Sequence, residues 1–99
     1  MKKGYAIVLL DVKEPDLYLE YARQATEIES RYGGRALVAA DVAEIVDGSW
    51  PSERVVVLEF PSLDAARRWY RDPDYQQLVP LRHAATVSHV ALVEGFPAA

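Results

Sequence analysis

Apolar residues occur along this chain in short runs whose composition and spacing predict alternating strands and helices. Four segments have the β-branched and aromatic content typical of strands: residues 5–12, 35–46, 54–60 and 88–94. Helical spacing of apolar residues follows Pro15 and recurs over residues 63–71. Pro73 is predicted to start a further helical piece that Pro80 must kink or interrupt.

The first helix is predicted to begin at Pro15 and to end at Gly33-Gly34, with one glycine at positive φ. Its apolar stripe consists of five residues: Tyr18, Tyr21, Ala22, Ala25 and Ile28. Glu29 falls on the same stripe and is the exception to its apolar character.

This β-α-β-β-α-β order predicts an α+β protein with a ferredoxin-like fold, in which both helices lie on one face of an antiparallel sheet. With 99 residues, the chain is predicted to form a single domain over residues 1–99. Asp41 interrupts the second extended segment, which indicates a β-bulge at that position.

Both faces of the predicted sheet are apolar. In the first strand, one face carries Tyr5, Ile7 and Leu9, and the other carries Ala6, Val8 and Leu10. An antiparallel sheet with one face in water should instead alternate apolar and polar residues. Because the helices cover only one face, the pattern predicts a homodimer in which a second, identical sheet covers the other.

Composition excludes several kinds of site and partner. The net charge of −4, from 11 basic and 15 acidic residues, disfavours nucleic acid as a partner. The absence of cysteine excludes disulfides, thiolate catalysis and cysteine-based metal sites. The apolar run over residues 5–10 is too short for a signal peptide or a membrane span. We therefore predict a cytoplasmic protein with no membrane partner.

Two residues are candidates for catalysis, Glu59 and His83. Glu59 interrupts an apolar strand, so a buried carboxylate there could act as a general base or could pair with Arg35 as a structural ion pair. His83 could act as a base or as a haem ligand, but no converging carboxylate or thiolate ligands accompany it, and we predict no metal and no cofactor. The predicted ligand-binding residues are Arg35, Glu59, Trp69, Tyr70 and Arg82.

Several short segments together resemble one known family. They are Lys3-Gly4-Tyr5, Tyr32-Gly33-Gly34-Arg35, Val57-Leu58-Glu59-Phe60-Pro61-Ser62, Trp69-Tyr70, Pro73-Asp74-Tyr75-Gln76 and Pro80-Leu81-Arg82. In this order they resemble the domain of unknown function 1330 family. The resemblance implies a ferredoxin-like fold that pairs into a dimeric α/β barrel.

The sequence leaves three functions open. The first is a homodimer that binds a small organic molecule, whether or not it is an enzyme. The second is a non-enzymatic dimeric accessory or structural module. The third, implied only by relatives of the same fold, is a cofactor-free monooxygenase or isomerase-like enzyme.

Overall fold

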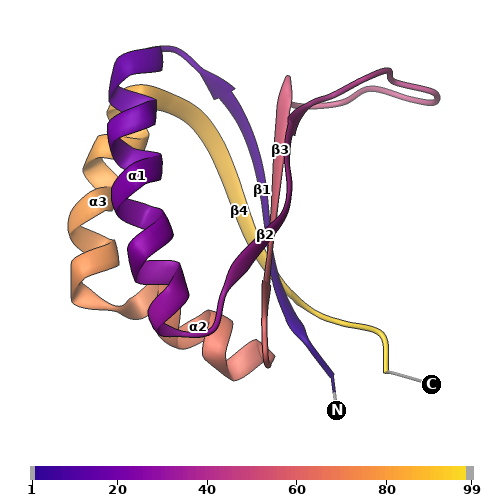
Figure 1. Ribbon diagram of the computed structural model, residues 1–99. Helices are drawn as coiled ribbons and strands as arrows, with labels where there is room; N and C mark the ends of the chain where they lie inside the picture. Colours follow the sequence, from indigo (N-terminus) through magenta and orange to yellow (C-terminus); the bar gives the residue numbers. More distant parts are fainter. Residues whose placement is uncertain (1, 98–99) are drawn as a thin grey trace.

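The computed structural model describes residues 2–97 as an antiparallel sheet with helices on one face (Figure 1). In chain order the elements are β1 (Gly4–Val12), α1 (Pro15–Arg31), β2 (Arg35–Asp41), β3 (Arg54–Phe60), α2 (Leu63–Arg71), α3 (Pro73–Ala85) and β4 (Thr86–Glu94). This is the predicted ferredoxin-like arrangement, and the fold is confirmed. Within residues 2–97, no helix has the length and apolar character needed to cross a bilayer.

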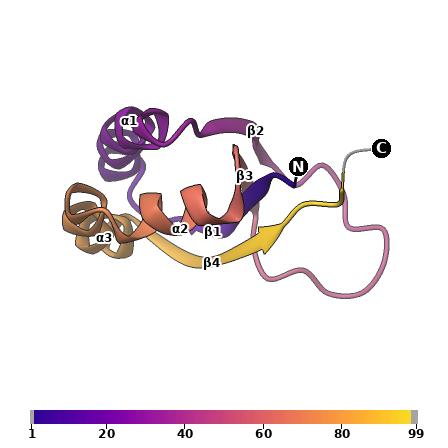
Figure 2. The same ribbon diagram turned by 90° about the horizontal axis from the view of Figure 1, so that it is seen from below.

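The strands lie in the order β2-β3-β1-β4, so β2 and β4 are the edges. Strand β2 is exposed along its whole length. Its predicted extension to residue 46 is wrong, because β3 begins only at Arg54, directly opposite Asp41. Residues beyond Asp41 have no strand to pair with. They enter the loop 42–53, which projects from the side of the sheet opposite the helices (Figures 1 and 2).

The β-bulge lies at Leu37 and not at Asp41. The register of β2 against β3 shifts between Ala36 and Val38, whereas Asp41 pairs in register. A bulge inserts one residue and resets which side chains face which way. As a result, Ala36 and Ala39 lie opposite Leu58 and Val56 and share their helix-facing side. The helix-facing side of β2 therefore carries small residues.

Helix α2 packs closely on the central strands. Ser62 is its N-cap residue, and the Ser62 Oγ accepts a hydrogen bond from the Ala65 backbone N–H at 3.0 Å. A Cβ added to Gly4 would lie 2.4 Å from the Ser62 carbonyl oxygen, so only glycine permits this approach. Trp69 from α2 is buried against Phe60, with ring centroids 5.2 Å apart. These contacts pack α2 tightly against β1 and β3.

Pro80 was predicted to kink or interrupt its helix; helix α3 runs through Pro80 from Pro73 to Ala85, so the interruption is wrong. Proline in a helix removes the hydrogen bond to the carbonyl four residues earlier, here that of Gln76. Both Gln76 and Pro80 are exposed. Water can therefore reach the carbonyl that loses its helical partner.

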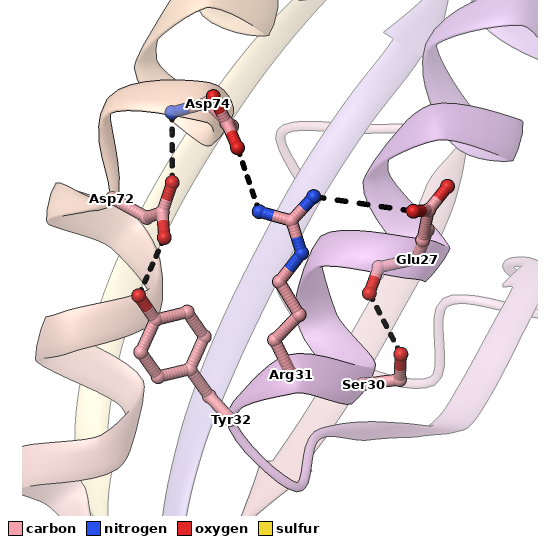
Figure 3. Close-up of polar contacts among 6 residues, drawn as sticks. All are labelled: Glu27, Ser30, Arg31, Tyr32, Asp72 and Asp74. Carbon is pink, nitrogen blue, oxygen red and sulfur yellow. Dashed lines mark hydrogen bonds and ion pairs between the residues drawn. The ribbon is translucent and has the colours of Figure 1, made fainter.

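Helix α1 packs on α3 and makes few contacts with the sheet (Figures 1 and 2). Polar contacts join the end of α1 to the start of α3 (Figure 3). Arg31 donates to the Asp74 carboxylate at 2.7 Å, and the Tyr32 hydroxyl donates to Asp72. Asp72 also accepts from the Asp74 backbone N–H at 2.7 Å and so caps α3. The two helices are thus held together at one end.

The turn after α1 requires glycine at Gly33, whose φ is 74°, as predicted. A Cβ added there would also lie 2.9 Å from Pro61 Cγ. We expect Gly33→Val to lower the free energy of unfolding by about 1 kcal/mol or more, because a β-branched residue resists this backbone region. Urea denaturation would measure the change.

Gly48→Val is the matched control for this prediction. Gly48 has a similar φ of 70°, but an added Cβ would meet nothing within 4 Å. Its substitution should therefore cost less than that of Gly33. An unchanged urea midpoint for Gly33→Val would contradict the interpretation.

Candidate functional site

A pocket of about 230 Å³ lies between α1 and the helix-facing side of the sheet. Its walls are mostly aliphatic side chains of β1, β2 and β3, together with Trp69 of α2. Its polar residues are Tyr18, Tyr21, Thr26, Glu29, Arg54 and Arg82.

The pocket exists because α1 rests on α3 and because the facing residues are small. Ala22 of α1 and Ala36 and Ala39 of β2 line the space with single methyl groups. Leu19 of α1 and both β2 alanines are exposed. The pocket therefore opens between α1 and the β2 edge.

A chain of hydrogen-bonded polar side chains at the contact of α1 with α3 includes two residues of the pocket lining, Tyr21 and Arg82. The Tyr21 and Tyr75 hydroxyls lie 2.6 Å apart, and Arg82 donates to the Tyr75 hydroxyl at 2.9 Å. Burial, reinforced by the neighbouring Tyr75 phenol, raises the pKa of Tyr21. The phenol therefore stays protonated at neutral pH and acts as a hydrogen-bonding group.

Arg82 is a buried cation with unused hydrogen-bonding capacity. Its exposed fraction is 5%. Within residues 2–97 no carboxylate forms an ion pair with it, and its Nε has no hydrogen-bond partner. Trp69 Nε1, in the same pocket wall, also lacks an acceptor within these residues. Unpaired buried donors cost free energy, and both of these nitrogen atoms are enclosed by protein and not exposed to the pocket.

Arg54 marks another part of the pocket wall, at the start of β3. It donates to the Tyr18 hydroxyl at 3.4 Å, and its guanidinium lies 5.8 Å from the centroid of that ring. Asp41 lies 3.6 Å from it at the end of β2. Unlike Arg82, this arginine therefore has an acidic neighbour.

Glu29 is the one acidic residue among those that line the pocket. Its side chain is half-buried, and within residues 2–97 it forms no side-chain hydrogen bond or ion pair. Burial raises the pKa of Glu29 to about 7. Charged and neutral forms of this carboxyl therefore coexist at neutral pH.

The predicted ligand-binding residues divide between the two faces of the sheet. Trp69 and Arg82 line the pocket. Tyr70 is half-buried beside it, with its ring centroid 5.5 Å from that of Tyr75. Arg35 and Glu59 lie on the opposite face of the sheet and do not line the pocket.

Of the two catalytic candidates, neither lines this pocket. His83 is exposed on α3 and meets Arg82 at 3.4 Å. Sequence reasoning did not identify Tyr18, Tyr21, Glu29 or Arg54 as site residues. One feature of the sequence could have indicated the pocket: Glu29 is a charged residue within the apolar stripe of α1.

Glu59 is the acceptor at the centre of a cross-strand cluster. Its carboxylate accepts from Arg35 Nη2 at 3.1 Å and from the Tyr5 hydroxyl at 3.1 Å, and its side chain is 14% exposed. Burial alone would raise the pKa of Glu59, but the hydrogen bonds from Arg35 and Tyr5 outweigh it and hold the pKa below its ordinary value. The carboxylate is thus held in its charged form, which suits a structural ion pair better than a base that works near neutral pH.

No cluster of three or more His, Asp or Glu side chains suited to a metal ion occurs among residues 2–97. The pocket itself contributes one carboxylate and no histidine to its lining. Its chemistry is that of a carboxyl group, phenols and guanidinium groups around apolar walls.

Residues 3–96 match the sequence model of the DUF1330 family, a domain of unknown function. The chain belongs to this family. No curated protein sequence matches the chain.

Solved structures share the fold at low sequence identity. A protein of unknown function from Rhodopseudomonas palustris is 22% identical, with a TM-score of 0.74, over 97% of this chain and 84% of that one. A dimeric ferredoxin-like protein of unknown function from Jannaschia is 13% identical, with a TM-score of 0.70, over 92% and 97% of the two chains. SnoaB, a cofactor-independent oxygenase from Streptomyces nogalater, is 14% identical, with a TM-score of 0.63, over 98% and 95%.

The Glu59 cluster predicts a pH-dependent contribution to stability. We expect Glu59→Gln to lower the Tm at pH 7, because the amide replaces a charged acceptor. The lowered pKa means that this stabilisation is present above the ordinary pKa of 4.5 and is lost as pH falls through the folded-state value. The gap in Tm between variant and wild type should therefore close in acid.

Thermal denaturation between pH 3 and pH 7 would check this prediction. Glu53→Gln, on an exposed residue just before β3, is the control and should leave the Tm unchanged. If Glu59→Gln matched the wild type at pH 7, the cluster would not contribute to stability.

Proposed function

We propose that this protein is a single ferredoxin-like domain that works as a homodimer and binds a small, mostly apolar organic molecule between α1 and the sheet. The pocket of about 230 Å³ is the observation that carries this proposal. An apolar cavity of roughly 150 Å³ is large enough for benzene, whereas pockets for drug-sized ligands begin at about 300 Å³. The volume therefore suits a molecule with one substituted ring.

The polar groups of the wall support a ligand that carries an acceptor oxygen. The lining includes the phenols of Tyr18 and Tyr21 and the guanidinium groups of Arg54 and Arg82, which are hydrogen-bond donors. Ligand sites are typically apolar with a few placed polar groups that fix orientation. A ring with a hydroxyl, carbonyl or carboxylate substituent would match both the aliphatic walls and these donors.

This pocket favours a binding function over a purely structural module. Side chains that served only to pack the domain would fill such a space, because unfilled volume forfeits dispersion contacts. Here the lining includes Ala22, Ala36 and Ala39, and the opening lies beside exposed β2. The likeness to SnoaB concerns the fold alone and adds no evidence for an oxygenase. A cytoplasmic location stays a prediction from the sequence.

The open face of the sheet supports the homodimer. Ile7, Leu9, Val55 and Val57 are only partly covered there, and Val38 is exposed. Contiguous apolar surface of this kind marks an interaction site. Solved relatives from Jannaschia and Thermobifida fusca are described as dimeric ferredoxin-like proteins. A second copy offers the same apolar, twisted surface and is the partner that we propose.

The dimer should be visible in the molar mass. Light scattering at micromolar concentration should give about twice the chain mass of 11.1 kDa. Val57 lies between Ile7 and Val38 on the open face. Val57→Asp should yield a folded monomer, because burying an unpaired charge in an interface costs several kcal/mol.

Leu17→Asp is the control for the dimer. Leu17 is an exposed leucine in the first turn of α1, away from the open face, so the same kind of change there should leave the mass doubled. A wild-type protein that is monomeric at these concentrations would contradict the proposal.

Filling the pocket should weaken binding of a small aromatic probe. We expect 4-fluorophenol to bind the wild type, observed as a saturable ¹⁹F NMR shift. Ala22→Leu places extra carbon atoms in the pocket at no cost in helix propensity. It should weaken binding at least about tenfold, equivalent to about 1.4 kcal/mol.

Ala84→Leu makes the same exchange on the exposed surface of α3 and is the matched control. It should bind the probe as the wild type does. Unchanged binding by Ala22→Leu would place the probe elsewhere, and no binding by the wild type would count against the pocket as a ligand site.

A further inference from the structure

Glu29 lines the pocket with a carboxyl group that has no partner within residues 2–97. No side chain or backbone N–H of these residues donates to it. The two arginines of the pocket wall have other partners, Arg54 with Tyr18 and Arg82 with Tyr75. A carboxylate left free in an apolar, partly enclosed site keeps its oxygen lone pairs available for a ligand.

Other acidic residues of α1 show how unusual this position is. Glu20 is paired with Arg23 at 2.7 Å on the exposed surface, and Glu27 lies 3.9 Å from Arg31. Glu29 is half-buried and, within residues 2–97, has no cation to offset its burial. A group that gains and loses a proton near neutral pH is suited to both steps of general acid–base catalysis.

Arg82 supplies the complementary half of the site. Arg82 lines the pocket, is buried and keeps its positive charge at all physiological pH values. Guanidinium groups favour carboxylate and other anionic oxygens, and this preference strengthens where water is excluded. The wall around Arg82 would therefore stabilise negative charge that develops on a ligand oxygen.

We propose that this pocket catalyses proton transfer at a carbon next to a carbonyl group, with Glu29 as the acid–base residue and Arg82 as the group that holds the anionic oxygen. The substrate class is a small 2-oxo acid or related ketone with one apolar ring. This inference rests on the proposed binding function of the same pocket.

The chemistry balances without an oxidant or a cofactor. The Glu29 carboxylate takes a proton from the carbon beside the carbonyl. The electron pair of that C–H bond forms a C=C bond, and the carbonyl π pair moves to oxygen, which becomes an enolate against Arg82. The protonated Glu29 then returns a proton to carbon and restores the ketone. In D₂O the carboxyl exchanges its proton with solvent, so each cycle places deuterium on the carbon.

Phenylpyruvate is a suitable probe because it carries a phenyl ring, a carboxylate and acidic C–H bonds beside a ketone. We expect the wild type to accelerate loss of its benzylic ¹H NMR signal in D₂O above the buffer rate. Glu29→Gln should reduce this acceleration at least 100-fold, within the range typical of general-base catalysis. Arg82→Lys should weaken phenylpyruvate binding more than it weakens 4-fluorophenol binding.

Glu27→Gln is the matched control, because Glu27 lies two residues away on α1 with a side chain that is 79% exposed. It should exchange phenylpyruvate at the wild-type rate. Glu29→Gln should remain folded, with a Tm at pH 8 no lower than that of the wild type, because the amide removes a buried charge.

The pH profile provides a second readout. Exchange should rise through pH 7 and level off above it, because the base is the deprotonated carboxyl. The other ionisable residues of the wall are Tyr18 and Tyr21 of α1, Arg54 of β3 and Arg82 of α3. Phenols and guanidinium groups ordinarily titrate near pH 10 or above. A rise near pH 7 that persists in Glu29→Gln would overturn the assignment.

Three further outcomes separate this inference from the proposed function. Binding of phenylpyruvate without exchange would overturn proton transfer and leave the binding function standing. Binding of 4-fluorophenol without binding of phenylpyruvate would overturn the substrate class. Binding of neither molecule would overturn both proposals.

Discussion

The docking of α1 on α3 is the contact on which the rest of this structure depends. Arg31 and Tyr32 tie the end of α1 to the start of α3, and the Tyr21 hydroxyl meets that of Tyr75 deeper in the interface. Because these contacts hold α1 against its neighbouring helix, it makes few contacts with the sheet. The pocket is the space that this arrangement leaves between helix and strands. A helix seated directly on β2 would close it.

The two faces of the sheet therefore have different surroundings: one borders the pocket under α1, and the other is open. On the helix side, the bulge at Leu37 turns Ala36 and Ala39 toward α1 and leaves room for a ligand. On the other side, the apolar surface around Val57 is the one that we propose a second copy covers. Residues in successive strand positions point to opposite faces. A substitution on one face therefore leaves the side chains of the other face largely unchanged. The pocket and the proposed dimer surface share strands but not side chains.

Two carboxyl groups, one on each side of the sheet, have pKa values shifted in opposite directions because their surroundings differ. Glu59 accepts hydrogen bonds from Arg35 and Tyr5, and these hold its pKa below the ordinary value. Glu29 has no such partners within residues 2–97, and burial raises its pKa to about 7. The first carboxylate is stabilised as an anion in a cross-strand cluster. The second is left able to exchange a proton, which is why the inferred chemistry centres on it.

The sequence by itself determined the order of elements, the two-faced apolar strands and the glycine turn at Gly33, because these depend on local periodicity and backbone preference. It also singled out Glu59, which is a charged residue within an otherwise apolar strand segment. Only the tertiary structure decided that Glu59 faces away from the pocket and that Glu29 faces into it. Strand register, the position of a bulge and the tilt of a helix follow from packing between distant segments. Those three quantities set which side chains share a cavity, and no local pattern encodes them.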